Sequence, residues 1–376
     1  MNSIKIIDAD SHVYEVEETF AHLPKEFEYR RPVPITLKPK VEAPYLGVDN
    51  AFWLVDGKVV NSPWGKGAVQ IGCPLTSELA KMKVFSVESQ SLRDVNARVR
   101  DLDKAGVDIQ VLYSSLFLVP LSDDDVLETA LMKSYNTWIA ERCSHHPERL
   151  KWAAVLPLRQ PHEAVKEISR VKDMGAVSLE VYGTVGDRFL HKPEFDPVWA
   201  AASDANLPIC VHVGWSYPPL RASCDDFMSS IIVSFGLPLM VGFYSFVGGG
   251  ILDRFPKLEV GFLEGGAGWI PWFMERMDHY YPVASFFMKS FGQSALTTKR
   301  PSDYADRIYV TCEADETLLP QVIECLGEDK IMVSEDMPHF EEREGSMKEL
   351  DRRSDISESQ KRKILHENPA RFYRLA

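Results

Sequence analysis

Hydrophobic and polar positions follow a regular order along most of the chain. From about residue 87, short apolar runs of strand length alternate with amphipathic stretches of helix length. Residues 98–108, for example, show helical periodicity that ends at Gly106, and the apolar run that begins at Ile109 predicts a buried strand. Counted from the start, the pattern predicts strands near residues 4, 109, 151, 176, 208, 258, 307 and 330.

Eight buried strands separated mostly by helices predict an α/β fold with a parallel sheet, closed into a (β/α)₈ (TIM) barrel. A doubly wound open sheet is the alternative. It is less favoured because no glycine-rich nucleotide-binding fingerprint follows any predicted strand. We treat residues 1–376 as a single domain.

One segment, about 20–86, interrupts the pattern between the first strand and the first regular helix. Within it, residues 51–60 predict a β-hairpin with Asp56-Gly57 in a type I′ turn, flanked by Trp53 and Trp64. Insertions of this length are often functional, so we predict a lid-like insertion. The alternative is a segment that only packs on the surface.

Composition narrows the function classes. The chain is 45% hydrophobic and 26% charged, as in soluble globular proteins, and its formal net charge of −13 argues against a nucleic-acid surface. We expect no apolar window long enough for a membrane span, and no signal peptide ahead of the first strand. Six cysteines without CxxC pairs suit reduced thiols, so we expect a cytoplasmic protein.

Candidate chemistry begins at the first strand. Asp10 and His12 are two residues apart and therefore project to the same side, which supplies half of a divalent metal site. Taken alone, the same residues also fit a strand followed by a turn and a helix cap. The ends of the later strands add metal-capable side chains, namely Glu180, His212, Glu264, Glu313, Asp336 and His339. Such groups are costly to bury unless they are paired or coordinated, so the set predicts a metal site at the carboxyl ends of the strands.

Five stretches carry a family resemblance: DADSHVYE (8–15), HVGW (212–215), LEGGAGWIPW (263–272), SEDMPHFE (334–341) and ENPARFYRL (367–375). The chain resembles the amidohydrolase superfamily, in the branch of aminocarboxymuconate-semialdehyde decarboxylase and related aromatic-acid decarboxylases and hydrolases. The resemblance covers almost the whole chain. It implies one divalent metal ion (Zn, Mn or Fe) held by Asp10, His12, His212 and Asp336.

Two departures from the family pattern affect the chemistry. The family often has histidine where Asp10 stands, and a carboxylate there shifts the preference towards a harder ion such as Mn²⁺ or Fe²⁺. Strand 6 usually carries a histidine where this chain has Glu264, which is expected either to move protons or to become a metal ligand. Asp336 is expected to accept a proton from water, His339 to contact Asp336 or the substrate, and Glu15 to orient His12.

These observations lead to a metal-dependent enzyme that hydrolyses or decarboxylates a small aromatic or unsaturated carboxylic acid. The alternative is a non-heme di-iron monooxygenase, in which two irons share these residues with Glu180 and Glu264 as further carboxylate ligands. Glu180 is equally consistent with a salt bridge at the barrel rim. A third hypothesis is a scaffold or binding protein without catalysis, and the intact ligand set argues against it. We expect a small-molecule substrate, no nucleic-acid or membrane partner, and a homodimer.

Overall fold

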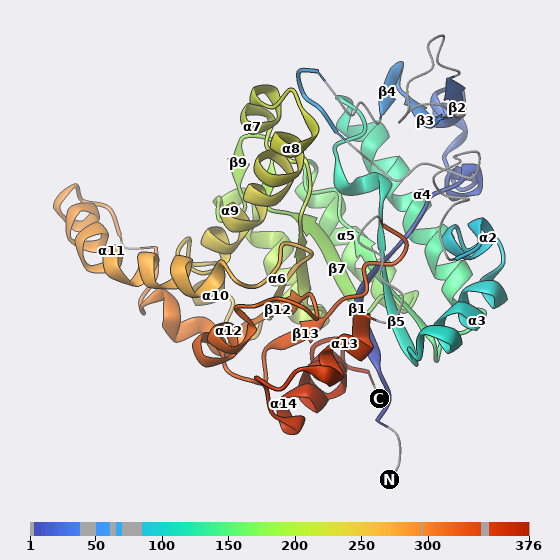
Figure 1. The fold of residues 1–376 in the computed structure, drawn as a ribbon. Helices are drawn as coiled ribbons and strands as arrows, with labels where there is room; N and C mark the ends of the chain where they lie inside the picture. Colours follow the sequence, from blue (N-terminus) through green and yellow to red (C-terminus); the bar gives the residue numbers. More distant parts are fainter. Residues whose placement is uncertain are drawn as a thin grey trace.

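The structure, a computed structural model, describes residues 4–37, 50–60, 65–69, 85–294, 296–339 and 346–375. Eight parallel strands form one sheet in the order β1-β5-β6-β7-β10-β11-β12-β13, and helices surround it (Figure 1). The strands are β1 (Ile7–Val13), β5 (Ile109–Ser114), β6 (Leu150–Val155), β7 (Ser178–Tyr182), β10 (Ile209–His212), β11 (Val260–Leu263), β12 (Ile308–Cys312) and β13 (Ile331–Val333).

The segment after β13 closes the barrel against β1. Ser334 Oγ donates to the Asp10 carbonyl oxygen at 2.6 Å, and the Asp336 amide donates to the same oxygen at 3.2 Å. The His12 amide donates to the Met337 carbonyl oxygen at 2.5 Å. These bonds stand in place of a regular ladder, and the predicted (β/α)₈ barrel is confirmed.

Helix α3 lies where the apolar periodicity predicts a helix. In α3, the Asp94 side chain caps the first turn by accepting from the Ala97 amide, and Gly106 ends the helix with φ of 79°. The helices of the barrel layer are α2 (Val87–Gln90), α3 (Val95–Ala105), α4 (Asp125–Cys143), α5 (Pro161–Asp173), α6 (Asp196–Ala205), α9 (Leu237–Phe246), α10 (Ile251–Arg254), α11 (Ile270–Ser290) and α12 (Leu319–Leu326).

Shorter elements lie in the loops and near the C-terminus. They are η1 (Glu17–Phe20), η2 (Lys25–Arg30), η3 (Leu116–Leu118), β8 (Thr184–Val185), β9 (Arg188–Phe189), η4 (Pro193–Phe195), α7 (Pro218–Ser223), α8 (Phe227–Ser229), η5 (Ser230–Gly236), η6 (Pro301–Arg307), α13 (Ser346–Arg352), α14 (Glu358–Arg362), η7 (Lys363–Glu367) and α15 (Asn368–Phe372).

The C-terminal segment fills part of the barrel interior. Phe372 and Tyr373 are buried among inward-facing strand residues, and Tyr373 Oη donates to the Ala9 carbonyl oxygen at 2.7 Å. Gly261 is required here because a Cβ at that position would lie 2.9 Å from the Phe372 ring. The interior is therefore packed, and chemistry is confined to the loops at the carboxyl ends of the strands.

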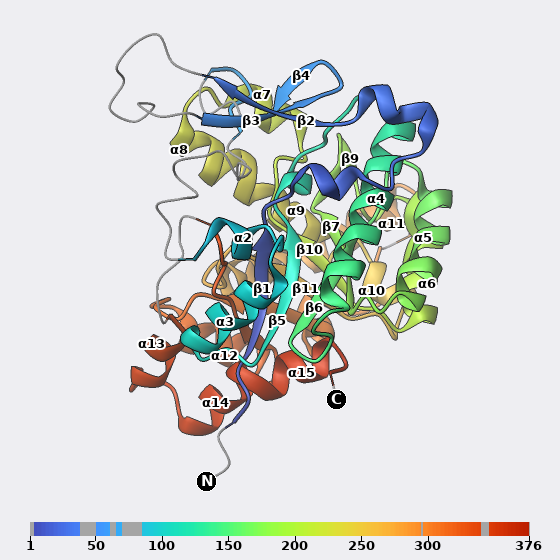
Figure 2. The same cartoon turned by 90° about the vertical axis from the view of Figure 1, so that its right-hand side faces the viewer.

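Parts of the insertion form a three-stranded antiparallel sheet of β2 (Val33–Leu37), β3 (Asn50–Val55) and β4 (Lys58–Val60), beyond the carboxyl ends of the barrel strands (Figure 2). The hairpin prediction is confirmed, and the positive φ of Asp56 (49°) and Gly57 (76°) matches a type I′ turn. Trp53 is buried against Phe20, whereas Trp64 lies outside the described residues. The lid role and the single-domain assignment stay predictions.

One sequence expectation is wrong. Within the described residues, Phe227–Arg254 is long and apolar enough to cross a membrane by length and composition, and a window of 18 residues in it has a mean hydropathy of 1.9. Its α9 portion packs directly on the barrel. A Cβ on Gly183 would lie 1.7 Å from the Pro238 carbonyl oxygen, and a Cβ on Gly242 would lie 2.8 Å from Val211. The apolar composition of α9 is thus used for contact with the strands.

Candidate metal centre

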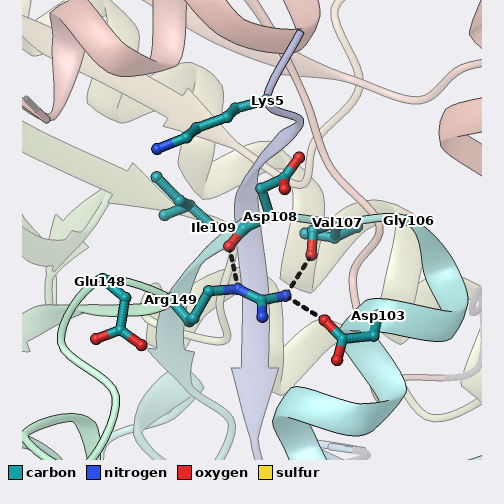
Figure 3. Close-up of a pocket in the computed structure, with 8 residues that line it drawn as sticks. All are labelled: Lys5, Asp103, Gly106, Val107, Asp108, Ile109, Glu148 and Arg149. Atoms are coloured by element: carbon teal, nitrogen blue, oxygen red, sulfur yellow. Dashed lines mark hydrogen bonds and ion pairs between the residues drawn. The ribbon is translucent and has the colours of Figure 1, made fainter. Parts of the chain in front are cut away.

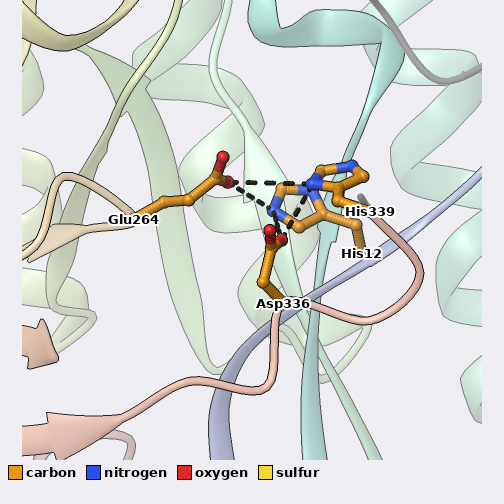
Figure 4. Close-up of side chains that lie close together, drawn as sticks. All are labelled: His12, Glu264, Asp336 and His339. Carbon is orange, nitrogen blue, oxygen red and sulfur yellow. Dashed lines mark hydrogen bonds and ion pairs between the residues drawn. The ribbon is translucent and has the colours of Figure 1, made fainter. Parts of the chain in front are cut away.

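Metal-capable side chains meet at the carboxyl ends of the strands. Two sets of ligand atoms form there, and within each set all atoms lie within 4.8 Å of one another. One set contains His12, Glu264, Asp336 and His339, from β1 and from the segments after β11 and β13 (Figure 4). The other contains Asp10, His12 and His212, so both sets share His12. The structure thus brings together six side chains that the sequence singles out.

His12 lies at the centre of the cluster. Its Nδ1 donates to the Ser114 carbonyl oxygen at 2.8 Å, which leaves Nε2 with a lone pair facing the site. That Nε2 lies 3.0 Å from Glu264 Oε2, 3.6 Å from Asp336 Oδ1 and 3.8 Å from Asp10 Oδ1. Burial, followed by the nearby His339 and His212, holds the pKa of His12 well below its usual range. His12 is therefore prepared as a neutral ligand.

Asp10 and His212 show that this site fits a cation. Both side chains are fully buried, and neither Asp10 carboxylate oxygen nor His212 Nε2 makes a hydrogen bond within the described part of the chain. Asp10 Oδ1 and His212 Nε2 lie 3.4 Å apart. Burial would lower the pKa of His212, but Asp10 and the other nearby carboxylates outweigh it and raise this pKa to about 10. A divalent cation would satisfy these buried atoms, and the donors present suit one.

Two carboxylates reach the cluster from strained backbone. Glu264 has φ of 63° and Asp336 has φ of 51°, both in the left-handed region that non-glycine residues seldom adopt. The Glu264 amide donates to Thr311 Oγ1 at 3.0 Å, which helps to hold this conformation. Strain of this kind is retained where it positions functional groups, and here it directs both carboxylates towards His12 (Figure 4).

His339 supports the cluster from the segment after β13. Its Nδ1 lies 2.8 Å from Asp336 Oδ1, and its Nε2 lies 2.9 Å from Ser115 Oγ. Its ring centroid is 4.0 Å from that of His12. The predicted contact between His339 and Asp336 is confirmed, and His339 Nδ1 also lies 4.0 Å from Glu264 Oε2.

Three other acidic residues stay outside both sets. Glu180 is fully buried and accepts from the Ser114 amide at 3.3 Å, and burial raises its pKa to about 7. Its role as a ligand stays a prediction. Glu313 is exposed. The expectation that Glu15 orients His12 is wrong, because its carboxylate accepts instead from the amides of Ser115 (3.1 Å) and Leu116 (2.9 Å).

The sequence analysis missed a buried network behind His12. Arg98 is fully buried; its Nη2 donates to the His12 carbonyl oxygen at 2.9 Å and its Nε to Gln110 Oε1 at 2.8 Å. Gln110 Nε2 donates to Asp8 Oδ2 at 2.7 Å, and Asp8 Oδ1 accepts from the Glu335 amide at 3.1 Å. The network ties β1, β5 and the segment after β13 together. A charged residue at position 98, in the apolar stripe of α3, was the available signal.

The Glu15 carboxyl predicts a pH effect on stability. Burial raises its pKa to about 8 from an ordinary value near 4.5, so the folded state holds a proton that the unfolded state releases. This contribution is complete below about pH 4.5 and is lost as pH rises through about 8. Relative to Glu15→Gln, the wild type should lose stability over that interval by up to about 1.4 kcal/mol per pH unit in urea unfolding. A constant difference between the two proteins would refute this assignment.

A pocket at the opposite end of the barrel lies beside the start of β5 at Ile109 (Figure 3). Within it, the Arg149 guanidinium donates to the carbonyl oxygens of Val107 (3.0 Å) and Asp108 (2.5 Å) and to Asp103 Oδ1 (2.8 Å). These bonds fix the loop between α3 and β5. Because the polar groups are used in that way and lie at the amino ends of the strands, we assign this pocket a structural role.

The sequence profile of the family described as Amidohydrolase matches residues 96–375, most of the chain. The chain belongs to the amidohydrolase family. Its sequence is 24% identical to the gamma-resorcylate decarboxylase of Polaromonas sp. (strain JS666) over 301 residues, which are 77% of this chain and 90% of that protein. This amidohydrolase therefore has a decarboxylase among its relatives, and the predicted resemblance is confirmed.

Solved structures support the same barrel. An amidohydrolase from Mycobacterium avium subsp. paratuberculosis K-10 superposes with a TM-score of 0.77 at 20% identity, covering 99% of this chain and 98% of that one. The 5-carboxyvanillate decarboxylase of Novosphingobium aromaticivorans, with bound manganese, gives a TM-score of 0.68 at 21% identity, covering 80% and 85%. Together with the donor set of this amidohydrolase, these comparisons support a divalent metal enzyme, and they give no support to the di-iron oxygenase alternative.

Proposed function

We propose that this amidohydrolase decarboxylates a small aromatic carboxylic acid, using one Mn²⁺ ion held by Asp10, His12, His212 and Asp336. The observation that carries the proposal is the buried Asp10–His212 pair, whose ligand atoms have no hydrogen-bond partner among the described residues and converge with His12. The donors include carboxylates, which favour Mn²⁺ over softer ions. The gamma-resorcylate and 5-carboxyvanillate decarboxylases support decarboxylation over hydrolysis.

Residues of this chain transfer the proton and position the reacting groups. When bound, the ion supplies a Lewis acid that polarises substrate oxygens. Glu264, with a side chain 14% exposed, delivers a proton to the ring carbon that bears the carboxylate. The carbon–carbon bond then breaks, its electron pair restores the aromatic ring, and CO₂ leaves. Glu264 regains its proton from solvent, and His339, 4.0 Å from it and bonded to Asp336, holds these groups in place.

Replacing Glu264 by glutamine tests its proton transfer. Glutamine keeps the shape but cannot release the proton, so kcat should fall by roughly 10²–10⁴-fold. Metal content should stay at one ion per chain, because Glu264 is not among the four proposed ligands. Steady-state assays combined with elemental analysis measure both. Full activity in Glu264→Gln would contradict this role, and loss of the ion would instead make Glu264 a ligand.

The reaction itself is tested with carboxyl-labelled substrates. Manganese-loaded protein should release labelled CO₂ from a panel of hydroxylated benzoates that includes 2,6-dihydroxybenzoate, and Glu264→Gln should not. Cleavage of ester, amide or lactone substrates without CO₂ release from any aromatic acid would refute decarboxylation and favour the hydrolase.

Two further properties belong to this proposal. We propose that the protein is a homodimer. We also propose that its only ligand is a small-molecule substrate, because the acidic chain suits no nucleic acid. We also propose a cytoplasmic location, supported by cysteines that remain free thiols in the described part of the chain.

A further inference from the structure

Helix α11 carries apolar side chains away from the barrel. Its beginning is anchored, with Ile270 and Met274 buried, whereas its far end projects from the body of the molecule (Figure 1). Six large side chains on and just beyond this helix are 52% to 76% exposed. We call them the aromatic arm: Trp272, Tyr280, Val283, Phe286, Phe287 and Phe291.

The aromatic arm forms one face of its helix. Tyr280, Val283, Phe287 and Phe291 follow the i, i+3, i+7, i+11 spacing, which places them along one side, and Phe286 flanks them. A helix of this kind gains most of its stability from packing of its apolar face. Here that face points to solvent, so the arm has the composition of a buried surface without a cover from the described part of its own chain.

The charge pattern favours a second copy of the same chain as the cover. The chain has a formal net charge of −13, so two copies repel each other except where charge is sparse. Between Tyr280 and Gly292 the only charged residue is Lys289. This face is therefore one on which two identical acidic molecules can approach, and a twofold axis would bring the same patch of each copy together.

The exposed area of the aromatic arm is close to the area that one partner buries in a standard protein interface. Aromatic side chains bury about 150–250 Å² each, so five that are at least half exposed offer roughly 600 Å². A standard interface buries about 800 Å² per partner, and Val283 with the flanking chain can supply the remainder. A membrane surface fits less well, because helices that lie on membranes are rich in Lys and Arg, whereas the arm has Lys289 alone beyond Tyr280.

We propose that the protein forms a twofold homodimer in which the aromatic arms of two copies cover each other. The inference names the surface of the homodimer proposed above and does not depend on the reaction. If it fails, CO₂ release and metal binding are unaffected, so its failure is distinguishable from failure of the proposed function.

Sedimentation velocity at micromolar concentration tests whether the aromatic arm forms the dimer interface. The wild type should have twice the chain mass of 42.6 kDa, and Phe286→Glu with Phe291→Glu should have the single-chain mass. Val126→Glu is the matched control, because Val126 on α4 is also 52% exposed but lies elsewhere; it should remain dimeric. Far-UV circular dichroism checks folding, and Phe286→Gln with Phe291→Gln repeats the test without added charge.

Three outcomes would overturn the inference. One is a wild type that is monomeric at micromolar concentration. Another is a folded arm variant, glutamate or glutamine, that keeps the dimer mass. The third is a monomeric wild type that floats with vesicles of phosphatidylcholine and phosphatidylglycerol, which would assign the arm to a membrane surface.

Discussion

Replacing Asp10 by asparagine is expected to remove the bound metal and the activity together. Asparagine preserves the shape of the side chain but removes the charge, and both oxygens of this buried carboxylate lack a hydrogen bond to any residue that the structure describes, as expected of a metal ligand. Loss of an outer partner of a metal site already costs roughly 10–100-fold in affinity, and loss of a direct ligand should cost more. Elemental analysis and a manganese titration measure the effect.

Glu313→Gln is the matched control for this experiment. It also changes a carboxylate at a strand end to its amide, but Glu313 is exposed and lies outside both sets of ligand atoms. Metal content and kcat should stay at wild-type values in this variant. If Asp10→Asn kept full metal content and activity, Asp10 would not be a ligand and the assignment of the site would fail.

Replacing Arg98 by methionine is expected to have the largest effect on stability. The variant keeps an apolar stem but leaves Gln110 Oε1 and the His12 carbonyl oxygen without their charged donor in the interior. Breaking a buried charged network by removing one partner costs about 3–5 kcal/mol. Urea unfolding measures the loss, and manganese affinity should fall as well, because the network holds the backbone of His12, a proposed ligand.

Arg100→Met on the same helix provides the comparison. Arg100 is exposed and pairs with Asp94 at 3.3 Å, and exposed pairs of this kind contribute little to stability. If Arg98→Met unfolded at the same urea concentration as Arg100→Met, the network would not be a structural support of the metal centre.

The barrel could be predicted because its signals are local. Alternation of apolar strands and amphipathic helices, with a stop such as Gly106, depends on a few neighbouring residues. The convergence of the candidate ligands could be predicted for a related reason, because the strand ends of a parallel barrel meet whatever the loops do, as Asp10 and His212 show.

The features that could not be predicted depend mainly on contacts between residues that are far apart in the sequence. Glu15 could not be assigned from the sequence, because its partners Ser115 and Leu116 lie about a hundred positions away. The positive φ of Glu264 leaves no local trace, since the residue type itself disfavours it. The expectation for Phe227–Arg254 failed in a different way: the apolar window that it denied is present in the sequence, and only the fold shows that this window packs on the barrel.

Anomalous diffraction from crystals grown with manganese tests the central claim most directly. We predict one manganese peak bonded to Asp10, His12, His212 and Asp336, at the carboxyl ends of the strands. A peak bound by other residues, or no peak in fully folded protein under saturating manganese, would contradict the metal centre and with it the proposed decarboxylase.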